Sequence, residues 1–235
     1  YWNPEFLKPG QWDHDGRREI YNKAALTESK VKELKNISEN EGCIFLISVF
    51  GTIGAKVIAD MGIKNIKIPS HETTNIPLIK FCSNNFDKIY FSAGASTEKE
   101  VITANEILKN AEAEYTLMHC VSSYPCSDQN ANIGRINWLK TLNDAVGYSD
   151  HTGSTVIPAL TVAQGVTSIE KHFTTDKDLP GRDNKFALDP DEFKDMCTNI
   201  RAAENAIINH GIDFQEIERD TVENYRGRWE PQDYT

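Results

Sequence analysis

Short apolar runs alternate with segments of helical periodicity along most of this chain. Six of the runs are rich in β-branched or aromatic residues, which is typical of buried strands. The helical segments between them have apolar residues at every third or fourth position, which is typical of helices that pack on a sheet. The predicted strands are residues 43–50, 65–70, 88–92, 115–121, 145–149 and 167–173.

The helical segments begin and end at recognisable signals. Thr27 stands before an apolar stripe that Gly42 closes, as an N-cap and a C-terminal glycine do. Thr97 and Glu100 have the spacing of a capping box, in which each side chain accepts a hydrogen bond from the other residue's backbone. Both segments are therefore predicted to be helices.

A third helix begins at Asp189, where Pro190 takes the first helical position and Glu192 reaches back to the cap. Gly211 is the predicted stop. The predicted apolar face consists of Phe193, Cys197, Ile200, Ala203 and Ile207.

The repeated strand-helix order predicts an α/β fold with a parallel sheet and right-handed crossovers. No GxGxxG or GxxxxGK[ST] motif follows a strand, so the sequence favours a TIM-type (β/α)8 barrel over an open nucleotide-binding sheet. Such a barrel needs eight strands, and the pattern predicts six. We expect residues 1–26 to form a loop segment, residues 27–211 a barrel domain without its first two strands, and residues 212–235 a C-terminal extension.

Polar residues stand at the end of almost every predicted strand. In parallel α/β folds the carboxyl ends of the strands carry the functional side chains. The pattern therefore predicts a site at this end of the sheet. The residues are Ser48, Ser70, Glu72, Ser92, His119, Ser122, Ser149, His151 and His172.

His151 and His172 end neighbouring strands, which in a sheet lie about 4.8 Å apart. Two imidazoles at the same height suit a first-row divalent metal ion, to which Glu72 would add an oxygen. From the spacing alone, two separate histidines, each hydrogen-bonded to backbone, are the simpler interpretation. Glu170 or Asp150 is a candidate to accept the second N–H of a ligand imidazole.

The composition narrows the function classes. The formal net charge is −10, which argues against a nucleic-acid or anionic-membrane surface, and no apolar run is long enough to span a membrane. The five cysteines are scattered and without a CxxC pair, which fits reduced thiols, most of them in the core. With no secretory signal visible, we expect a cytoplasmic protein.

The strand ends lie within phrases that resemble the N-acetylneuraminate (sialic acid) synthase family and its legionaminate, pseudaminate and spore-coat-polysaccharide relatives. Several phrases match in order, spacing and content. They are KIPSHETTNIPLIKF (67–81), FSAGAS (91–96), LMHCVSSYP (117–125), VGYSDHTG (146–153) and IEKHFTTDKDLPGRD (169–183).

This resemblance implies an enzyme that condenses phosphoenolpyruvate with an N-acetylated amino-sugar aldehyde and releases phosphate. His151 and His172 would bind the divalent metal ion, manganese with magnesium or cobalt as alternatives, and Glu72 would manage protons. Tyr124 and Asp183 would contact the acyclic amino sugar. The positions implied to bind phosphoenolpyruvate are Ser48, Lys67, Ser70, Ser92, Ser122 and Ser149.

The resemblance also implies a homodimer, although the family's first two strands and its C-terminal antifreeze-like domain have no match here. Two other hypotheses stay open. One is a Schiff-base aldolase that uses Lys67 or Lys171. The other is a noncatalytic, truncated homologue that binds a ligand or partner only.

Overall fold

The computed structural model describes residues 17–228. Within this range six parallel strands form one sheet in the order β1-β2-β3-β4-β5-β6. Each strand therefore pairs with the next strand of the sequence, which is the topology of repeated right-handed β-α-β units. The strands are β1 (Ile47–Ser48), β2 (Asn65–Ile68), β3 (Lys88–Ser92), β4 (Glu114–Cys120), β5 (Val146–Asp150) and β6 (Ser168–Lys171).

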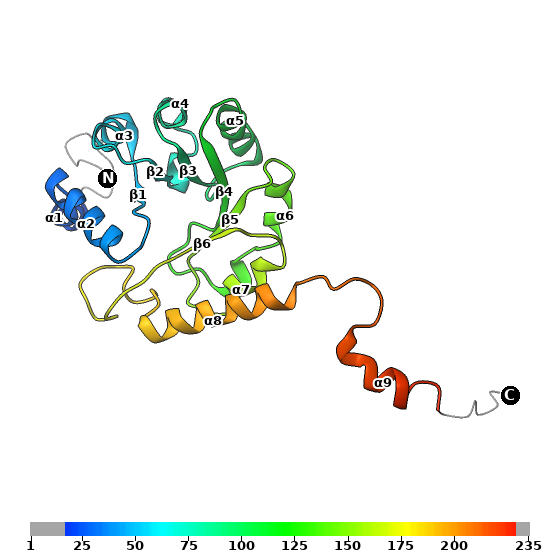
Figure 1. Ribbon diagram of the computed structural model, residues 1–235. Coiled ribbons are helices and arrows are strands. Elements are labelled where there is room, and N and C mark those ends of the chain that lie inside the picture. The colour runs from blue at the N-terminus through cyan, green and yellow to red at the C-terminus, as the bar shows by residue number, and fades with distance from the viewer. Residues whose placement is uncertain (1–16, 229–235) are drawn as a thin grey trace.

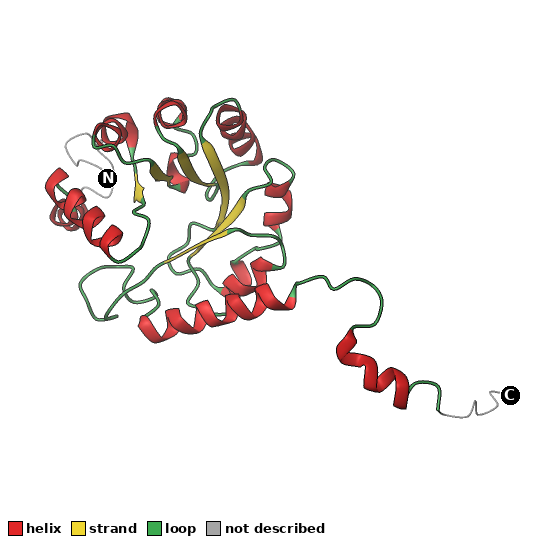
Figure 2. Cartoon of the chain, viewed as in Figure 1, coloured by secondary structure: helices red, strands yellow, loops and turns green. Residues whose placement is uncertain are grey.

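The sheet curls, and the helices lie along its outer side (Figure 1). Figure 2 shows β1 and β6 as the two edges of this curved layer. The helices that follow the strands are α3 (Gly51–Asp60), α4 (Ile76–Asn85), α5 (Glu98–Lys109), α6 (Arg135–Lys140), α7 (Ile157–Val162) and α8 (Pro190–Ala206). The structure is a six-stranded curled parallel α/β sheet, and the complete eight-stranded barrel stays a prediction.

The hydrophobic core lies between the sheet and this outer layer of helices. Strand residues that alternate along the chain, such as Ile66, Ile89 and Leu117, are fully buried in it. Leu78 and Val101, from α4 and α5, belong to the same core. Since side chains alternate between the two faces of a strand, the residues between these apolar positions point to the inner side of the sheet.

The strand predictions are confirmed in number and order, and β3 matches its predicted bounds. β1 is shorter than predicted, because within the described residues it is an edge strand paired only with β2, and Ile44, near the start of the predicted strand, is 81% exposed. The prediction of an irregular segment before residue 27 is wrong for α1 (Arg17–Ala24). The rest of that call lies outside the described residues.

Before β1 lies α2 (Glu28–Asn40), which Thr27 caps as predicted and whose Val31 belongs to the core. Short 3-10 turns, η3 (Ser70–Glu72) and η4 (Asp128–Asn130), follow β2 and β4. After α8 the chain leaves the sheet and forms η5 (Glu216–Glu218) and α9 (Arg219–Asn224), which lie apart from the main body in Figure 1. No helix in the described part is long and apolar enough to cross a membrane.

Helix α8 confirms its predicted start and corrects its predicted face. The capping box of Asp189 and Glu192 is present in both directions. The helix ends at Ala206 rather than at Gly211, and the residue that it buries is Met196, whereas Cys197 on the predicted apolar face is exposed. All five cysteines are free thiols, and three of them, Cys82, Cys120 and Cys126, are buried.

We expect Asp189→Ala to lower the free energy of unfolding by about 1 kcal/mol, because it removes the side-chain acceptor for the Glu192 backbone N–H. Urea denaturation followed by circular dichroism measures this change. Asp195→Ala, at an exposed position within the same helix, is the matched control. Equal stability of Asp189→Ala and the control would contradict the role of the cap.

Candidate active site

The inner side of the sheet carries one cavity-lining residue from each of the six strands. These residues share one face because the strands are paired in register, with Ser48 beside Lys67 and Ser149 beside both Cys120 and Glu170. The alternation that sends apolar residues outward therefore sends this set inward. The set is Ser48, Lys67, Ser92, Cys120, Ser149 and Glu170.

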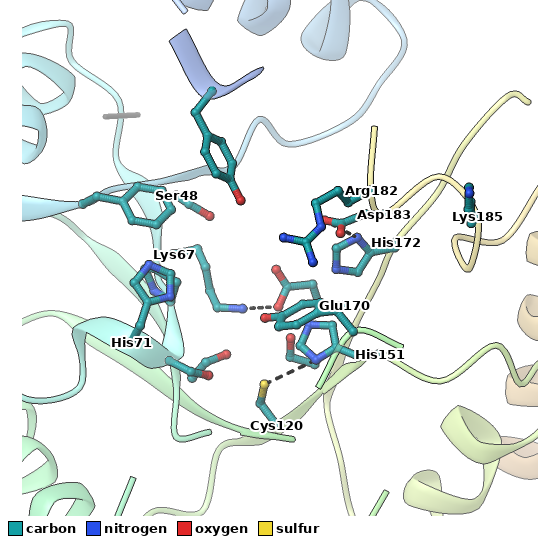
Figure 3. A pocket seen from close by; sticks show the side chains of 17 residues that line it. Ser48, Lys67, His71, Cys120, His151, Glu170, His172, Arg182, Asp183 and Lys185 are labelled. Carbon is teal, nitrogen blue, oxygen red and sulfur yellow. Dashed lines mark hydrogen bonds and ion pairs between the residues drawn. The ribbon is translucent and has the colours of Figure 1, made fainter. Parts of the chain in front are cut away.

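These residues form part of the wall of a cavity of about 760 Å³. Figure 3 shows their side chains, together with those from the loops after the strands, converging on one space. The loops add residues of several chemical types. They are Phe50, Pro69, Ser70, His71, Tyr124, His151, His172, Arg182, Asp183 and Lys185, and Tyr21 comes from α1.

Lys67 and Glu170 form an ion pair inside this cavity, between strands β2 and β6. The lysine side chain is 5% exposed, so its ammonium group is held close to the carboxylate rather than in solvent. Burial alone would raise the pKa of Glu170. Attraction to Lys67 and hydrogen bonds from Lys67 and Ser149 outweigh burial and lower this pKa, so the carboxylate is ionised at neutral pH.

His151 and His172 lie together at one side of the cavity, with ring centroids 5.2 Å apart. The Nδ1 atom of His151 lies 2.9 Å from the carbonyl oxygen of Val121. In the tautomer that donates this hydrogen bond, the lone pair is on Nε2. Nδ1 of His172 lies 3.7 Å from an Asp183 carboxylate oxygen. A carbonyl or carboxylate beside the second ring nitrogen is the usual environment of a metal-binding histidine.

The donor chemistry of this pair suits a divalent metal ion, with Glu170 and Asp183 as the nearby carboxylates. Across residues 17–228 there is no group of three or more His, Cys, Asp or Glu side chains already arranged around one metal position. The protein ligands on which a metal site here would depend are therefore the two imidazoles.

Tyr124 lies over the histidine pair, with its ring centroid 4.2 Å from that of His151 and 6.1 Å from that of His172. Burial and neighbouring negative charges, Asp183 and Glu170 among them, raise the pKa of Tyr124 to about 12. The phenol therefore stays protonated at neutral pH and is available as a hydrogen-bond donor at the cavity mouth.

Most of the predicted site residues meet in the cavity. Glu72 and Ser122 do not line it. The Glu72 carboxylate accepts a hydrogen bond of 2.6 Å from the Asn75 side chain, because η3 turns it toward the start of α4. Ser122 lies just behind the wall, with its hydroxyl 3.8 Å from the Cys120 thiol. The predicted residues that do line the cavity are Ser48, Lys67, Ser70, Ser92, Tyr124, Ser149, His151, His172 and Asp183.

Arg182 is a cavity residue that sequence reasoning missed, because it lies in an irregular loop with no periodicity. Figure 3 shows its guanidinium group pointing into the cavity. Cys120 was also missed as a wall residue. It lies two residues after Met118 on β4, so both side chains point to the same face of the sheet as Ser92 and Ser149. Its thiol lies 3.7 Å from Nδ1 of His151.

Lys171 has no role as an imine-forming residue at this site. Its side chain is 1% exposed, is bonded to oxygen atoms on the outer side of the sheet and does not line the cavity. Lys67 faces the cavity, but its ammonium group is paired with the Glu170 carboxylate, whereas imine formation needs an amine that is free to attack a carbonyl carbon.

Comparisons with known proteins identify the family of this chain. The family model described as the NeuB family matches residues 2–211. This chain belongs to the NeuB family. Its NeuB-family relatives include the N,N'-diacetyllegionaminic acid synthases of Legionella pneumophila, 34% identical over 86% of this chain, and of Campylobacter jejuni, 37% identical over 75% of it.

The fold agrees as well. The N-acetylneuraminic acid (sialic acid) synthetase of Leptospira borgpetersenii superposes with a TM-score of 0.83 at 28% identity, over 90% of this chain and 74% of that one. This chain matches 59% of the length of the Legionella relative and 54% of the Campylobacter relative.

We expect Gly94→Ala to disturb the wall of this cavity. An added Cβ would lie 2.6 Å from the Ser122 hydroxyl, 2.8 Å from the Ser70 hydroxyl and 2.9 Å from the Cys120 carbonyl. Overpacking of this kind costs about 1–3 kcal/mol of folding free energy, which urea denaturation measures. In the control variant Gly134→Ala the added Cβ meets no atom within 4 Å. A Gly94→Ala protein as stable as this control would contradict the close packing of the wall.

Proposed function

We propose that this cavity joins phosphoenolpyruvate to an N-acetylated amino-sugar aldehyde, giving a nonulosonic acid and inorganic phosphate. The observation that carries the proposal is the presence of two chemically different halves in one cavity. One half, on the side of β1 to β3, holds Lys67 with the hydroxyls of Ser48, Ser70 and Ser92. The other half, on the side of β5 and β6, holds the two histidines with Tyr124 and Asp183. Membership of a family that includes named synthases of such acids supports it.

The first half suits the anionic substrate. The hydroxyl of Ser92 is buried in the cavity wall and has no hydrogen-bond partner within the described part of the protein. A phosphate or carboxylate oxygen would accept from it and remove the cost of that unpaired group. Lys67 and the guanidinium group of Arg182 would add positive charge, and a guanidinium matches both anions with two parallel N–H donors.

The second half suits the aldehyde. His151 and His172 would bind a divalent cation, which when bound supplies Lewis-acid polarisation of the aldehyde oxygen. Tyr124 would donate a hydrogen bond to a hydroxyl or amide oxygen of the open-chain sugar, and Asp183 would accept one from a hydroxyl group. The two substrates would thus be held side by side, which turns a bimolecular step into one within a complex.

The reaction needs one proton to be accepted and one to be delivered. The enol carbon forms the new C–C bond to the aldehyde carbon, whose oxygen gains a proton. Water adds to the carbon that bears the phosphate and loses a proton. The C–O bond to phosphate then breaks as the new hydroxyl group becomes the ketone and its proton leaves with the phosphate. We assign acceptance of the proton from water to Glu170, because it is ionised and oriented by Lys67 and Ser149. The earlier assignment of proton transfer to Glu72 stays a prediction.

We expect His151→Ala and His172→Ala to abolish metal-dependent release of phosphate from phosphoenolpyruvate in the presence of N-acetylmannosamine or a diacetamido analogue. A chelator should do the same to the parent protein. A colorimetric phosphate assay measures each rate, with His210→Ala, an exposed histidine outside the cavity, as control. Undiminished turnover in either cavity variant would refute the metal assignment.

We expect Glu170→Gln to lower kcat by about 10² to 10⁴, the usual contribution of a positioned acid or base. Glu106→Gln, at an exposed position on α5, is the control. The same assay on Glu72→Gln tests the earlier assignment. Full activity of Glu170→Gln together with loss of activity in Glu72→Gln would move proton transfer to Glu72.

A further inference from the structure

A buried ion pair lies on the outer side of the sheet, directly behind the two cavity histidines. Asp150 precedes His151, Lys171 precedes His172, and the two residues are partners in the β5-β6 register. Their charged atoms are 2.5 Å apart, and the side chains are 0% and 1% exposed. The pair therefore joins the ends of β5 and β6 at the position from which both imidazoles leave the sheet.

Lys171 is bonded to more than its partner. Its ammonium group also donates to the carbonyl oxygens of Thr152 at 2.7 Å and Ser154 at 3.0 Å. Asp150 in turn accepts from the Thr152 backbone N–H at 2.8 Å and from the Thr152 hydroxyl at 3.0 Å. The residues on both sides of His151 are thus held by one charged pair.

The pair is itself supported from the core side. The Tyr148 hydroxyl donates to Asp150 at 2.8 Å. The Tyr148 ring stacks on His119, at 5.6 Å between centroids, and Nε2 of His119 lies 2.8 Å from the carbonyl oxygen of Ala131. This network fills the space behind the cavity wall with directional contacts, so it restricts the position of Asp150 more than apolar packing would.

We infer that Asp150 and Lys171 are positioning residues for His151 and His172, an inference that rests on the proposed metal-dependent function. A buried ion pair contributes little net stability compared with apolar residues of the same volume, and its best-attested use is to specify one arrangement of the elements that it joins. Here the ion pair would fix the register of β5 against β6, that is, their offset along the strand direction. Two imidazoles bind one metal ion only when this offset brings them to the same level.

The test compares stability with metal affinity in the full chain without substrate. Lys171→Met leaves the Asp150 carboxylate buried and unpaired, so we expect a large loss of thermal stability. Adding Asp150→Asn removes that charge and should restore stability. We expect the affinity for Mn²⁺, measured by calorimetric titration, to stay about 10- to 100-fold below that of the parent, as is usual when the support of a ligand histidine is lost.

Two controls separate the possible failures. Tyr115→Phe removes a different interior hydrogen bond, from the Tyr115 hydroxyl to Asn105. Tyr115 lies near the start of β4, at the end of the sheet away from the histidines, so this variant should leave Mn²⁺ affinity unchanged. His151→Ala should abolish Mn²⁺ binding. If the parent itself binds no Mn²⁺, the proposed metal site and this inference both fail.

If the parent binds Mn²⁺ and the folded double variant binds it equally well, the positioning role alone is overturned. Asp150→Asn gives the same comparison if the double variant does not fold, because Lys171 keeps its two carbonyl acceptors. Reduced Mn²⁺ affinity in this folded variant supports the inference, and unchanged affinity overturns it.

Discussion

The two-residue repeat of the β-strand is the constraint on which both the core and the cavity of this protein depend. Along each strand one set of side chains packs against the helices, as Ile89 and Phe91 do from β3. The intervening set, which includes Ser92, faces the hollow of the sheet. Because neighbouring strands are parallel and in register, a shift of any strand by one residue would exchange apolar and polar side chains.

A local group of positively charged side chains makes the cavity of this acidic protein suitable for the anionic substrate that we propose. The net charge of the whole chain is −10, yet the cavity contains Lys67, Arg182 and Lys185. Lys67 is the buried member of this group, and it is paired with Glu170 from β6. In the proposed reaction this one ion pair would serve both substrates, since its cation attracts phosphoenolpyruvate and its anion accepts a proton.

At the ends of β5 and β6, consecutive residues place polar side chains on both faces of the sheet. Ser149 and Glu170 face the cavity, and the next residues, Asp150 and Lys171, face the core side as a buried ion pair. The chain then turns inward again at His151 and His172. Polar groups thus occur on both faces here, where the outer pair lies behind the proposed metal site, whereas elsewhere the core side of the strands is mostly apolar.

The sequence by itself determined the number and order of the strands, the parallel α/β fold, the capped helices at Thr97 and Asp189, and the position of His151 and His172 at the ends of neighbouring strands. These features follow from local periodicity, from capping chemistry and from strand parity, which are properties of short segments. Only the tertiary structure decided that Glu72 turns away from the cavity toward Asn75, and that Arg182 reaches into the cavity. Periodicity assigns a side chain to a face of its own strand, but the curl of the sheet and the path of the loops decide which distant residues meet across the hollow.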